Sequence, residues 1–180
     1  MDSGENSYRR YLNGDESAFG EIVELYFDKL TFFINGYVHD VHASEDVAIE
    51  TMTELVIHPG RFAFRSSLKT YLFSVGRHKA LNFLKKRRRE NLTELSEADA
   101  ADRASLERDV LAGERQKALA AAMAELPAEQ RTAVHLVYLE GLSYRDAAKV
   151  LGKSEKQVDN LLSAAKKRLR AELEKEGIEL

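Results

Sequence analysis

The chain has 180 residues, of which 44% are hydrophobic and 32% charged, so it is long enough for one large or two small domains with real cores. It contains no cysteine, which excludes disulfides, thiolate metal sites and cysteine nucleophiles and is compatible with a reducing cytoplasm. No apolar run approaches the roughly 18 residues of a membrane span, and the polar, acidic start lacks the apolar segment of a signal peptide. We therefore expect a cytoplasmic protein without membrane insertion.

The net charge of −3 hides a strong separation of charge along the chain. Residues 1–60 carry a net charge of −9, residues 61–89 carry +10 without a single carboxylate, residues 90–114 carry −6 and residues 115–180 carry +2. The continuous basic segment is a candidate nucleic-acid surface, because neutralising phosphates is the part of affinity that does not depend on sequence. Its acidic neighbours should repel DNA and favour a basic protein surface.

The first half of the chain is predicted to be helical from about residue 17 to residue 89. Apolar residues recur at helical spacing over 19–34, and the segment 36–43 is prone to turns. A second helix is predicted to open at Ser44 and to run to about Ile57. It ends there because His58-Pro59-Gly60 disfavours helix and opens a turn.

A third long helix is predicted from about Leu68 to Arg88, and it carries five consecutive Lys and Arg residues near its end. Cations beside exposed aromatic rings suit unstacked bases as well as phosphates. The aromatic residues before and at the start of this helix are Phe62, Phe64, Tyr71 and Phe73. In the alternative interpretation these rings are core residues, and the basic run is a solvated helix end that the helix dipole favours. The core interpretation is favoured for Phe73 and Phe83, whereas both stay open for Tyr71 and residues 64–69.

Residues 90 to about 113 are acidic, rich in Ala and Ser, and only weakly periodic. We expect them to form a flexible acidic linker that is partly helical. A second helical domain then begins at Glu114, with Pro127 near a helix start, where its missing N–H costs nothing. The sequence thus predicts an all-α protein with domains over 1–90 and 114–180, joined by a linker over 91–113.

The last third of the chain is typical of a helix-turn-helix. Ser143 is a predicted N-cap for a short helix over Tyr144–Leu151, and Gly152 supplies the left-handed turn that ends it. Ser154 and Gln157 form a capping box for the next helix. That helix shows amide and lysine side chains near its start, which suit the major groove of duplex DNA, and later basic residues that suit phosphates. An ordinary helical hairpin with a solvated charged face is the alternative.

Three motifs in this order resemble those of an extracytoplasmic function (ECF, group 4) sigma factor of bacterial RNA polymerase, within the sigma-70 family. Ala43-Ser44-Glu45-Asp46-Val47 with Glu50 resembles region 2.2, residues 71–89 resemble regions 2.3 and 2.4, and residues 126–170 resemble region 4. The resemblance covers nearly all of the chain. It implies a region 2 helical bundle and a region 4 helix-turn-helix, joined by the acidic linker.

The resemblance implies an alternative sigma factor that binds core RNA polymerase and directs promoter-specific transcription initiation. In such factors the region 2.2 helix docks on the clamp helices of the β′ subunit, which assigns contacts to Glu45, Asp46 and Glu50. Region 4 docks on the β flap and reads the −35 element as duplex. An anti-sigma factor is a further implied partner. No catalytic group, cofactor or metal is implied, since the polymerase does the chemistry.

The loop before the region 2.4 helix is similar to one that captures a base flipped from the −10 non-template strand. Extruding a base costs stacking and pairing energy. A pocket that binds one particular base strongly enough to offset this cost makes melting sequence-selective. The implied −10 contacts are Phe64, Arg65, Ser66, Ser67, Lys69, Tyr71, Arg77, His78, Lys79, Asn82, Lys85 and Lys86. The implied −35 contacts are Arg145, Lys153, Ser154, Lys156, Gln157, Asp159, Asn160, Ser163, Lys166 and Lys167.

Several positions depart from the family pattern. Ile49 stands where Gln is common and Met52 where Phe is common, and both suit a packed amphipathic helix. His78 stands where Asn is frequent, which leaves its −10 contact open. Asp159 replaces a common Lys, and arginines are absent at 161 and 164, so we expect an unfamiliar −35 preference.

Two other classes of function stay open on the sequence. A stand-alone helix-turn-helix regulator would usually bind a two-fold operator as a dimer, and no dimerisation helix is evident. A protein-interaction module that has lost promoter use is the other class, because of the departures in the second helix of the helix-turn-helix. His39 and His42 lie three residues apart, but without cysteines or a second pair they predict no zinc site.

Overall fold

The computed structural model describes residues 3–93 and 114–175, and within these ranges every regular element is helical. The chain divides into two compact units, Met1–Ala104 and Ser105–Leu180, and each is described by itself. The predicted all-α class is confirmed. In the described ranges, no helix is both long and apolar enough to cross a membrane.

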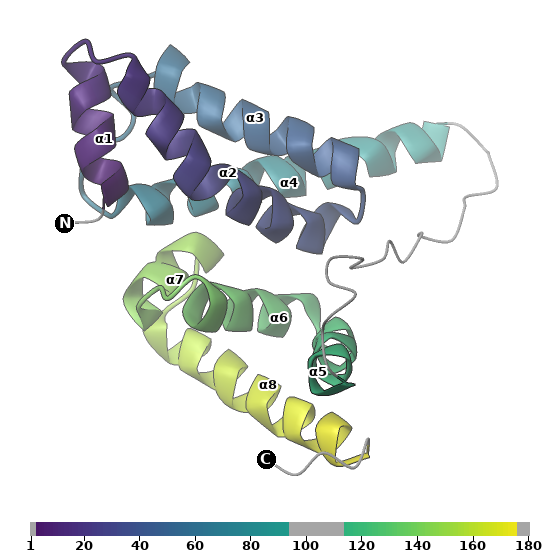
Figure 1. The fold of residues 1–180 in the computed structure, drawn as a ribbon. Coiled ribbons are helices and arrows are strands. Elements are labelled where there is room, and N and C mark those ends of the chain that lie inside the picture. The colour runs from purple at the N-terminus through teal and green to yellow at the C-terminus, as the bar shows by residue number, and fades with distance from the viewer. Residues whose placement is uncertain (1–2, 94–113, 176–180) are drawn as a thin grey trace. The chain divides into compact units, whose positions relative to one another are not determined.

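The described part of the first unit, residues 3–93, contains four helices, coloured purple to teal in Figure 1. They are α1 (Ser3–Leu12), α2 (Ser17–Val38), α3 (Val41–Ile57) and α4 (Leu68–Thr93). Helix α2 lies against each of the other three, and α3 also packs against α4. α2 is therefore the central helix of the bundle, as expected for an element with seven buried residues at helical spacing.

The core of this unit lies where α2 and α4 cross. Ile22, Leu30 and Ile34 of α2 are fully buried, and the rings of Phe33 and Phe73 lie 4.8 Å apart between their centroids. A side chain at Gly76 would begin 2.8 Å from the Leu30 methyl carbon. The absence of a Cβ at that position lets α4 approach α2 closely.

Helix α1 was not predicted, because the sequence pattern placed the first helix at about residue 17. The structure packs it on α2 and, more lightly, on α4. Tyr8 is completely buried, and its hydroxyl donates to the carbonyl oxygens of Leu55 and Pro59 at 3.0 and 3.2 Å. A Cβ on Gly4 would overlap the Tyr26 ring. α1 is thus a closely fitted part of the bundle.

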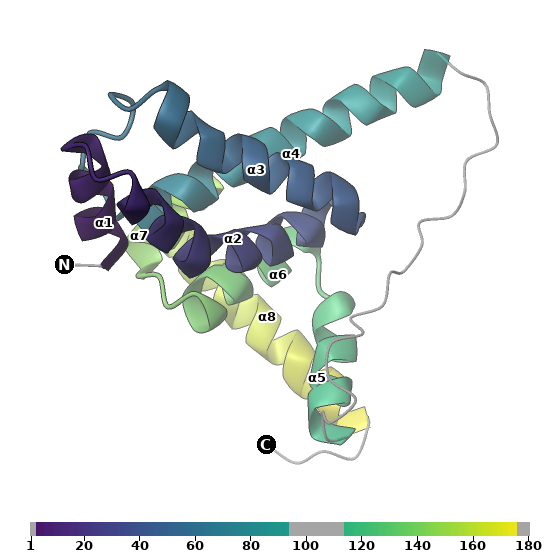
Figure 2. The same ribbon diagram turned by 45° about the horizontal axis from the view of Figure 1, so that its top comes forward.

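Two predicted helix boundaries were wrong. α3 begins at Val41 and not at Ser44, because the Asp40 side chain accepts from the Ala43 N–H at 3.1 Å and caps the helix. Ser44 is buried inside the helix and donates to the Asp40 carbonyl oxygen at 2.6 Å. α4 continues to Thr93, past the predicted end at Arg88. Its last turns extend beyond the other helices of the unit (Figure 1, Figure 2).

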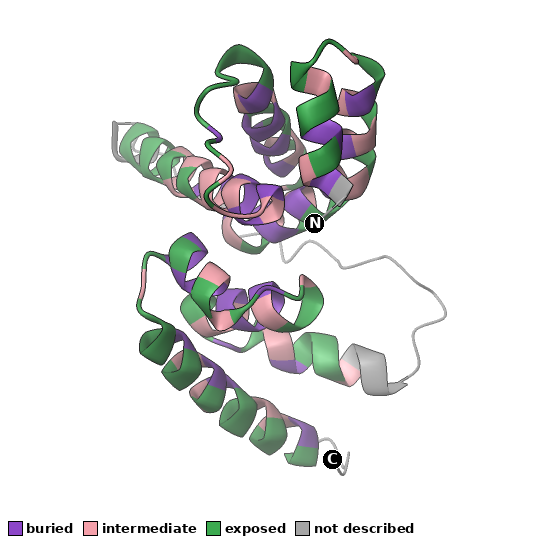
Figure 3. Cartoon of the chain, turned by 90° about the vertical axis from the view of Figure 1, so that its left-hand side faces the viewer, coloured by how far each residue is buried: buried purple, intermediate pink, exposed green. Residues whose placement is uncertain are grey.

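The second unit contains α5 (Glu114–Ala124), α6 (Ala128–Val134), a π-helical turn η1 (His135–Leu139), α7 (Tyr144–Leu151) and α8 (Glu155–Lys175). α8 packs against α5, α6 and α7. Its inner face is buried and its outer face is exposed along most of its length (Figure 3). Leu136, Ala147, Val158 and Leu162 form the centre of the core between these helices.

The predicted helix-turn-helix is confirmed in detail. Ser143 Oγ accepts from the Asp146 N–H at 3.1 Å, so Ser143 is the N-cap of α7. Gly152 ends α7 with a φ of 66°, a conformation that favours glycine. Ser154 and Gln157 form the expected capping box at the start of α8, with bonds of 3.2 and 2.8 Å.

Candidate polymerase and promoter interfaces

Helix α3 carries the three carboxylates that were assigned to core polymerase. Asp46 and Glu50 are exposed one turn apart, and Glu45 is half-buried. Glu45 lies 3.7 Å from His42 Nδ1, and Glu50 lies 3.6 Å from the ammonium of Lys79. The helix therefore presents negative charge outward, as a contact with a basic protein surface requires.

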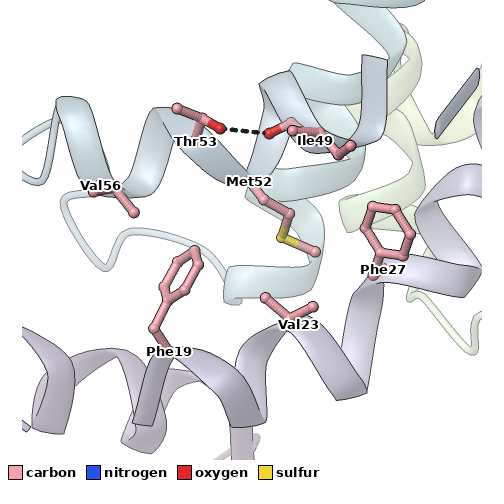
Figure 4. A pocket seen from close by; sticks show the side chains of 7 residues that line it. All are labelled: Phe19, Val23, Phe27, Ile49, Met52, Thr53 and Val56. Carbon is pink, nitrogen blue, oxygen red and sulfur yellow. Dashed lines mark hydrogen bonds between the residues drawn. The ribbon is translucent and has the colours of Figure 1, made fainter. Parts of the chain in front are cut away.

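An apolar groove of about 200 Å³ runs between α2 and α3, as Figure 4 shows. Thr53 contributes no free hydroxyl proton to it, because its Oγ1 donates to the Ile49 carbonyl oxygen at 2.7 Å. Ile49 is 53% exposed, whereas Met52 is buried. The groove is lined by Phe19, Val23, Phe27, Ile49, Met52, Thr53 and Val56.

The loop before α4 is held by a cluster of aromatic rings from two parts of the chain. Phe62 is buried, and its ring centroid lies 4.6 Å from Phe64 and 5.2 Å from Tyr71. Tyr8 of α1 lies 5.7 Å from Phe62 and 6.0 Å from Phe64. Tyr71 is half-buried, and burial raises its pKa above the usual value. These rings support the loop from inside.

The polar residues of this loop have different local roles. Arg65 is exposed, whereas Ser66 and Ser67 are half-buried. Ser67 Oγ accepts from the Thr70 N–H at 3.1 Å and so caps the start of α4. The structure therefore gives Ser67 a structural role beside its predicted DNA contact.

Lys79 of α4 lies within a small charge network. Its ammonium is 3.2 Å from Glu54 and 3.6 Å from Glu50, and Glu54 also accepts from Arg61 at 2.7 Å. The hydrogen bond from Lys79, followed by the nearby positive charges, lowers the pKa of Glu54 below its usual range. The network joins a residue assigned to the −10 element to one assigned to the polymerase.

The other −10 candidates on α4 fall on two kinds of surface. His78 and Asn82 are exposed one turn apart, with 3.4 Å between their side-chain nitrogens. Lys85 and Lys86 are exposed on the projecting part of the helix. Arg77 is half-buried and its Nε has no hydrogen-bond partner among the described residues. Lys69 is also half-buried, within the first turn of α4.

The −35 candidates gather around the start and outer face of α8. Lys156, Asp159, Asn160, Ser163 and Lys167 are exposed on that helix, and Arg145 is exposed on α7. Lys153 in the turn pairs with Glu129 of α6 at 2.9 Å. The sequence did not foresee this pair, which ties the turn to α6.

The π-helical turn adds two exposed apolar side chains that the sequence reading missed. Tyr138 and Leu139 are 51% and 61% exposed. The Lys166 ammonium lies 5.3 Å from the centroid of the Tyr138 ring, and its hydrogen bond with Tyr138 raises the pKa of Lys166. A π-turn adds a residue to the helix and is frequent at functional sites, but no local sequence signal marks it. In the described ranges no group of His, Cys, Asp and Glu side chains is arranged to hold a metal ion.

Comparison with known proteins gives matches over both units. The family model for Sigma-70 region 2 matches residues 22–90, and the model for Sigma-70, region 4 matches residues 116–169. The chain is 34% identical over 152 residues to the RNA polymerase sigma-H factor of Pseudomonas aeruginosa, with 79% of each chain covered. It is 27% identical to the ECF RNA polymerase sigma factor SigM of Bacillus subtilis, over 84% of this chain and 92% of that one.

A solved structure agrees with these relatives. The sigma factor RpoE of Bartonella quintana, solved in complex with the anti-sigma factor NepR, aligns with a TM-score of 0.66 at 25% identity. The alignment covers 87% of this chain and 96% of that one. The chain therefore belongs to the sigma-70 family as an ECF sigma factor, an alternative sigma factor that directs transcription initiation by RNA polymerase.

Proposed function

We propose that this sigma factor binds core polymerase through α3 and the adjoining apolar groove, and DNA through the loop before α4, α4 itself and α8. The observation that carries the proposal is the division of surfaces within the first unit. Exposed carboxylates and apolar side chains lie together on α3, whereas an exposed run of cations lies on the far part of α4. One surface suits a basic protein, and the other suits phosphates.

The α3 surface fits the β′ clamp helices in charge and in polarity. Asp46 and Glu50 supply exposed negative charge, and Ile49 and Val56 supply exposed apolar area on the same helix. An interface with an apolar centre and charged rim gains affinity from burial and specificity from charge. The second unit would bind the β flap and place the start of α8 in the major groove of the −35 duplex.

The remaining features complete the proposal. Residues 1–90 form the domain that binds core and the −10 element, residues 114–180 form the −35 domain, and residues 91–113 link them. The protein works in the cytoplasm and is not an enzyme, because the polymerase supplies the active site. An anti-sigma factor holds it inactive, a proposal supported by the complex in which the related RpoE was solved.

Run-off transcription with purified core polymerase tests the function directly. We expect initiation at a set of genomic promoters when the protein is added and none with core alone. Failure at every genomic promoter would contradict the proposal. Specific binding to promoter DNA without core, together with no stimulation of transcription, would favour a stand-alone helix-turn-helix regulator.

The assignment of α3 predicts that Asp46→Arg weakens core binding by more than about tenfold, because like charges placed together at an interface cost several kcal/mol. Asp28→Arg is the matched control, since Asp28 is exposed on α2 and does not line the groove. Affinity for core, measured by fluorescence anisotropy of the labelled protein, should fall only for Asp46→Arg. Equal affinities of the two variants for core would contradict the assignment of α3 to the interface.

A further inference from the structure

The N-terminal helix α1 reaches the loop before α4 through a cation–π contact. The guanidinium carbon of Arg9 lies 4.1 Å from the centroid of the Phe64 ring. Arg9 is exposed, whereas Phe64 is half-buried. One face of the ring is thus covered by a cation from a helix more than fifty residues away in sequence.

Phe64 has a backbone conformation that residues other than glycine rarely adopt. Its φ is 56°, in the left-handed region, which is costly for a bulky residue that is neither Gly nor Asn. Such a conformation persists only where the surroundings hold it, and it is often found at functional sites. Here the groups in contact with the Phe64 ring are the rings of Phe62 and Tyr8, 4.6 and 6.0 Å away between centroids, and the guanidinium of Arg9.

α1 is attached firmly enough to act as a fixed support. The buried hydroxyl of Tyr8 donates to two carbonyl oxygens at the end of α3 and in the following turn. Ser7 Oγ donates to Glu21 of α2 at 2.6 Å. The two residues that precede Arg9 in α1 are therefore anchored, and they hold the backbone from which the Arg9 side chain extends over the Phe64 ring.

We propose that Arg9 is a positioning residue for the loop before α4: by stacking on Phe64 it holds the left-handed turn that orients residues 65–67. This inference rests on the proposed role of that loop in capturing a −10 base. Because Phe64 is covered by Arg9, the ring supports the loop, and Arg65 and Ser66 are left to face the base. α1 then contributes to the choice of base without contacting it.

Limited trypsin digestion of the full chain tests the positioning without DNA. The rate of cleavage after Arg65, followed by mass spectrometry of the released peptides, reports how often the loop opens. We expect Arg9→Ala to raise this rate about two- to fivefold, the range that corresponds to an exposed cation–π contact. Arg9→Lys should restore most of the protection, because an ammonium also binds a ring face.

Arg10 provides a matched control for the loss of one positive charge from α1. Its guanidinium pairs with Asp15 at 2.6 Å and with Glu21 of α2 at 2.9 Å. Arg10→Ala should leave cleavage after Arg65 at the wild-type rate. A wild-type rate for Arg9→Ala, or an equal increase for both alanine variants, would overturn the proposal.

Base selectivity tests the consequence for DNA. Holoenzyme assembled with core polymerase is titrated with fork-junction DNA that carries each of the four bases in turn at the captured −10 position. We expect Arg9→Ala to lower the ratio of affinities between the best and the other bases, whereas Arg10→Ala keeps the ratio. A direct phosphate contact by Arg9 would instead weaken all four equally, and that result would overturn the positioning role.

A double-mutant cycle with Phe64→Leu separates stacking from any other effect of Arg9. Leu keeps an apolar side chain but has no ring face, so Arg9→Ala should add little in the Phe64→Leu background. Full additivity of the two changes would overturn the proposal. If wild-type holoenzyme distinguishes no base at this position, the proposed capture role of the loop fails, and the digestion rates still decide whether Arg9 holds Phe64.

Discussion

Gln157 and Ser154 bond to each other's backbone N–H groups at the start of α8, at 2.8 and 3.2 Å. Lys153 pairs with Glu129, and Lys79 pairs with Glu50 and Glu54. A side chain that has a partner within the fold must give up or share that contact to bind DNA. For these residues, loss of DNA binding in a variant has two possible origins, in the interface or in the fold.

Lys156 and Gln157 allow the two origins to be separated. Lys156→Ala should weaken −35 binding by roughly 1–3 kcal/mol if Lys156 reads a base, with little change in Tm. Gln157→Ala should lower both DNA affinity and Tm, because it also removes half of the capping box. Gln157→Glu keeps the cap but removes the amide donor, so it isolates the DNA effect. Equal losses on unrelated DNA sequences would make both residues phosphate contacts.

At the scale of elements, α1 depends on tertiary contacts for its stability. It has ten residues and a polar average composition, and isolated helices of this length are marginal in water. Its stability comes from Tyr8, which is buried and bonded to the end of α3. Burial raises the pKa of Tyr8 to about 12, with smaller contributions from Tyr71 and Tyr11.

This pKa predicts how the first unit responds to alkali. Below pH 10 the hydroxyl is protonated in both states, so its contribution to stability is complete. As pH rises from 10 to about 12 the unfolded chain loses the proton first, and stability should fall by about 1.4 kcal/mol per pH unit. Tyr8→Phe should be less stable at pH 7 by about 1 kcal/mol and lose less between pH 10 and 12. Urea unfolding at a series of pH values measures this. If the free energies of unfolding of the two proteins fell by the same amount between pH 10 and 12, the assignment would be contradicted.

For the whole molecule, the separation of charge matters more than its sum. The net charge is −3, but residues 61–89 carry +10 and the far part of α4 is exposed. DNA therefore meets a local field of opposite sign to the total. Because this field acts on phosphates, its contribution to affinity should depend on salt and not on base sequence.

Lys85→Ala tests this expectation. Loss of one phosphate contact should lower affinity on all promoter sequences and reduce the slope of log affinity against log salt by about 0.7 to 0.9. Lys29→Ala is the control, since Lys29 is exposed on α2 in the acidic part of the chain. Anisotropy titrations of holoenzyme over a range of salt concentrations measure both slopes. Equal slopes for wild type and Lys85→Ala would exclude the contact.

The sequence by itself determined the helical class, the order of the helices from residue 17 onward and the helix-turn-helix. The capping residues of the helix-turn-helix are Ser143, Gly152 and the Ser154–Gln157 pair. Each bonds to a partner within three or four residues, so its role can be predicted from the local sequence. The three motifs at 43–50, 71–89 and 126–170 likewise pointed to the family. These signals need no knowledge of distant contacts.

Only the tertiary structure decided the features that join distant residues. It shows that α1 packs on the bundle, that Ile49 is exposed at the groove between α2 and α3, and that Arg9 lies over the Phe64 ring. It also paired Lys79 with Glu54 and tied Lys153 to Glu129. A contact between residues far apart in sequence depends on how several helices pack together. The periodicity of one helix indicates which face is buried, but it does not identify the helices that cover that face.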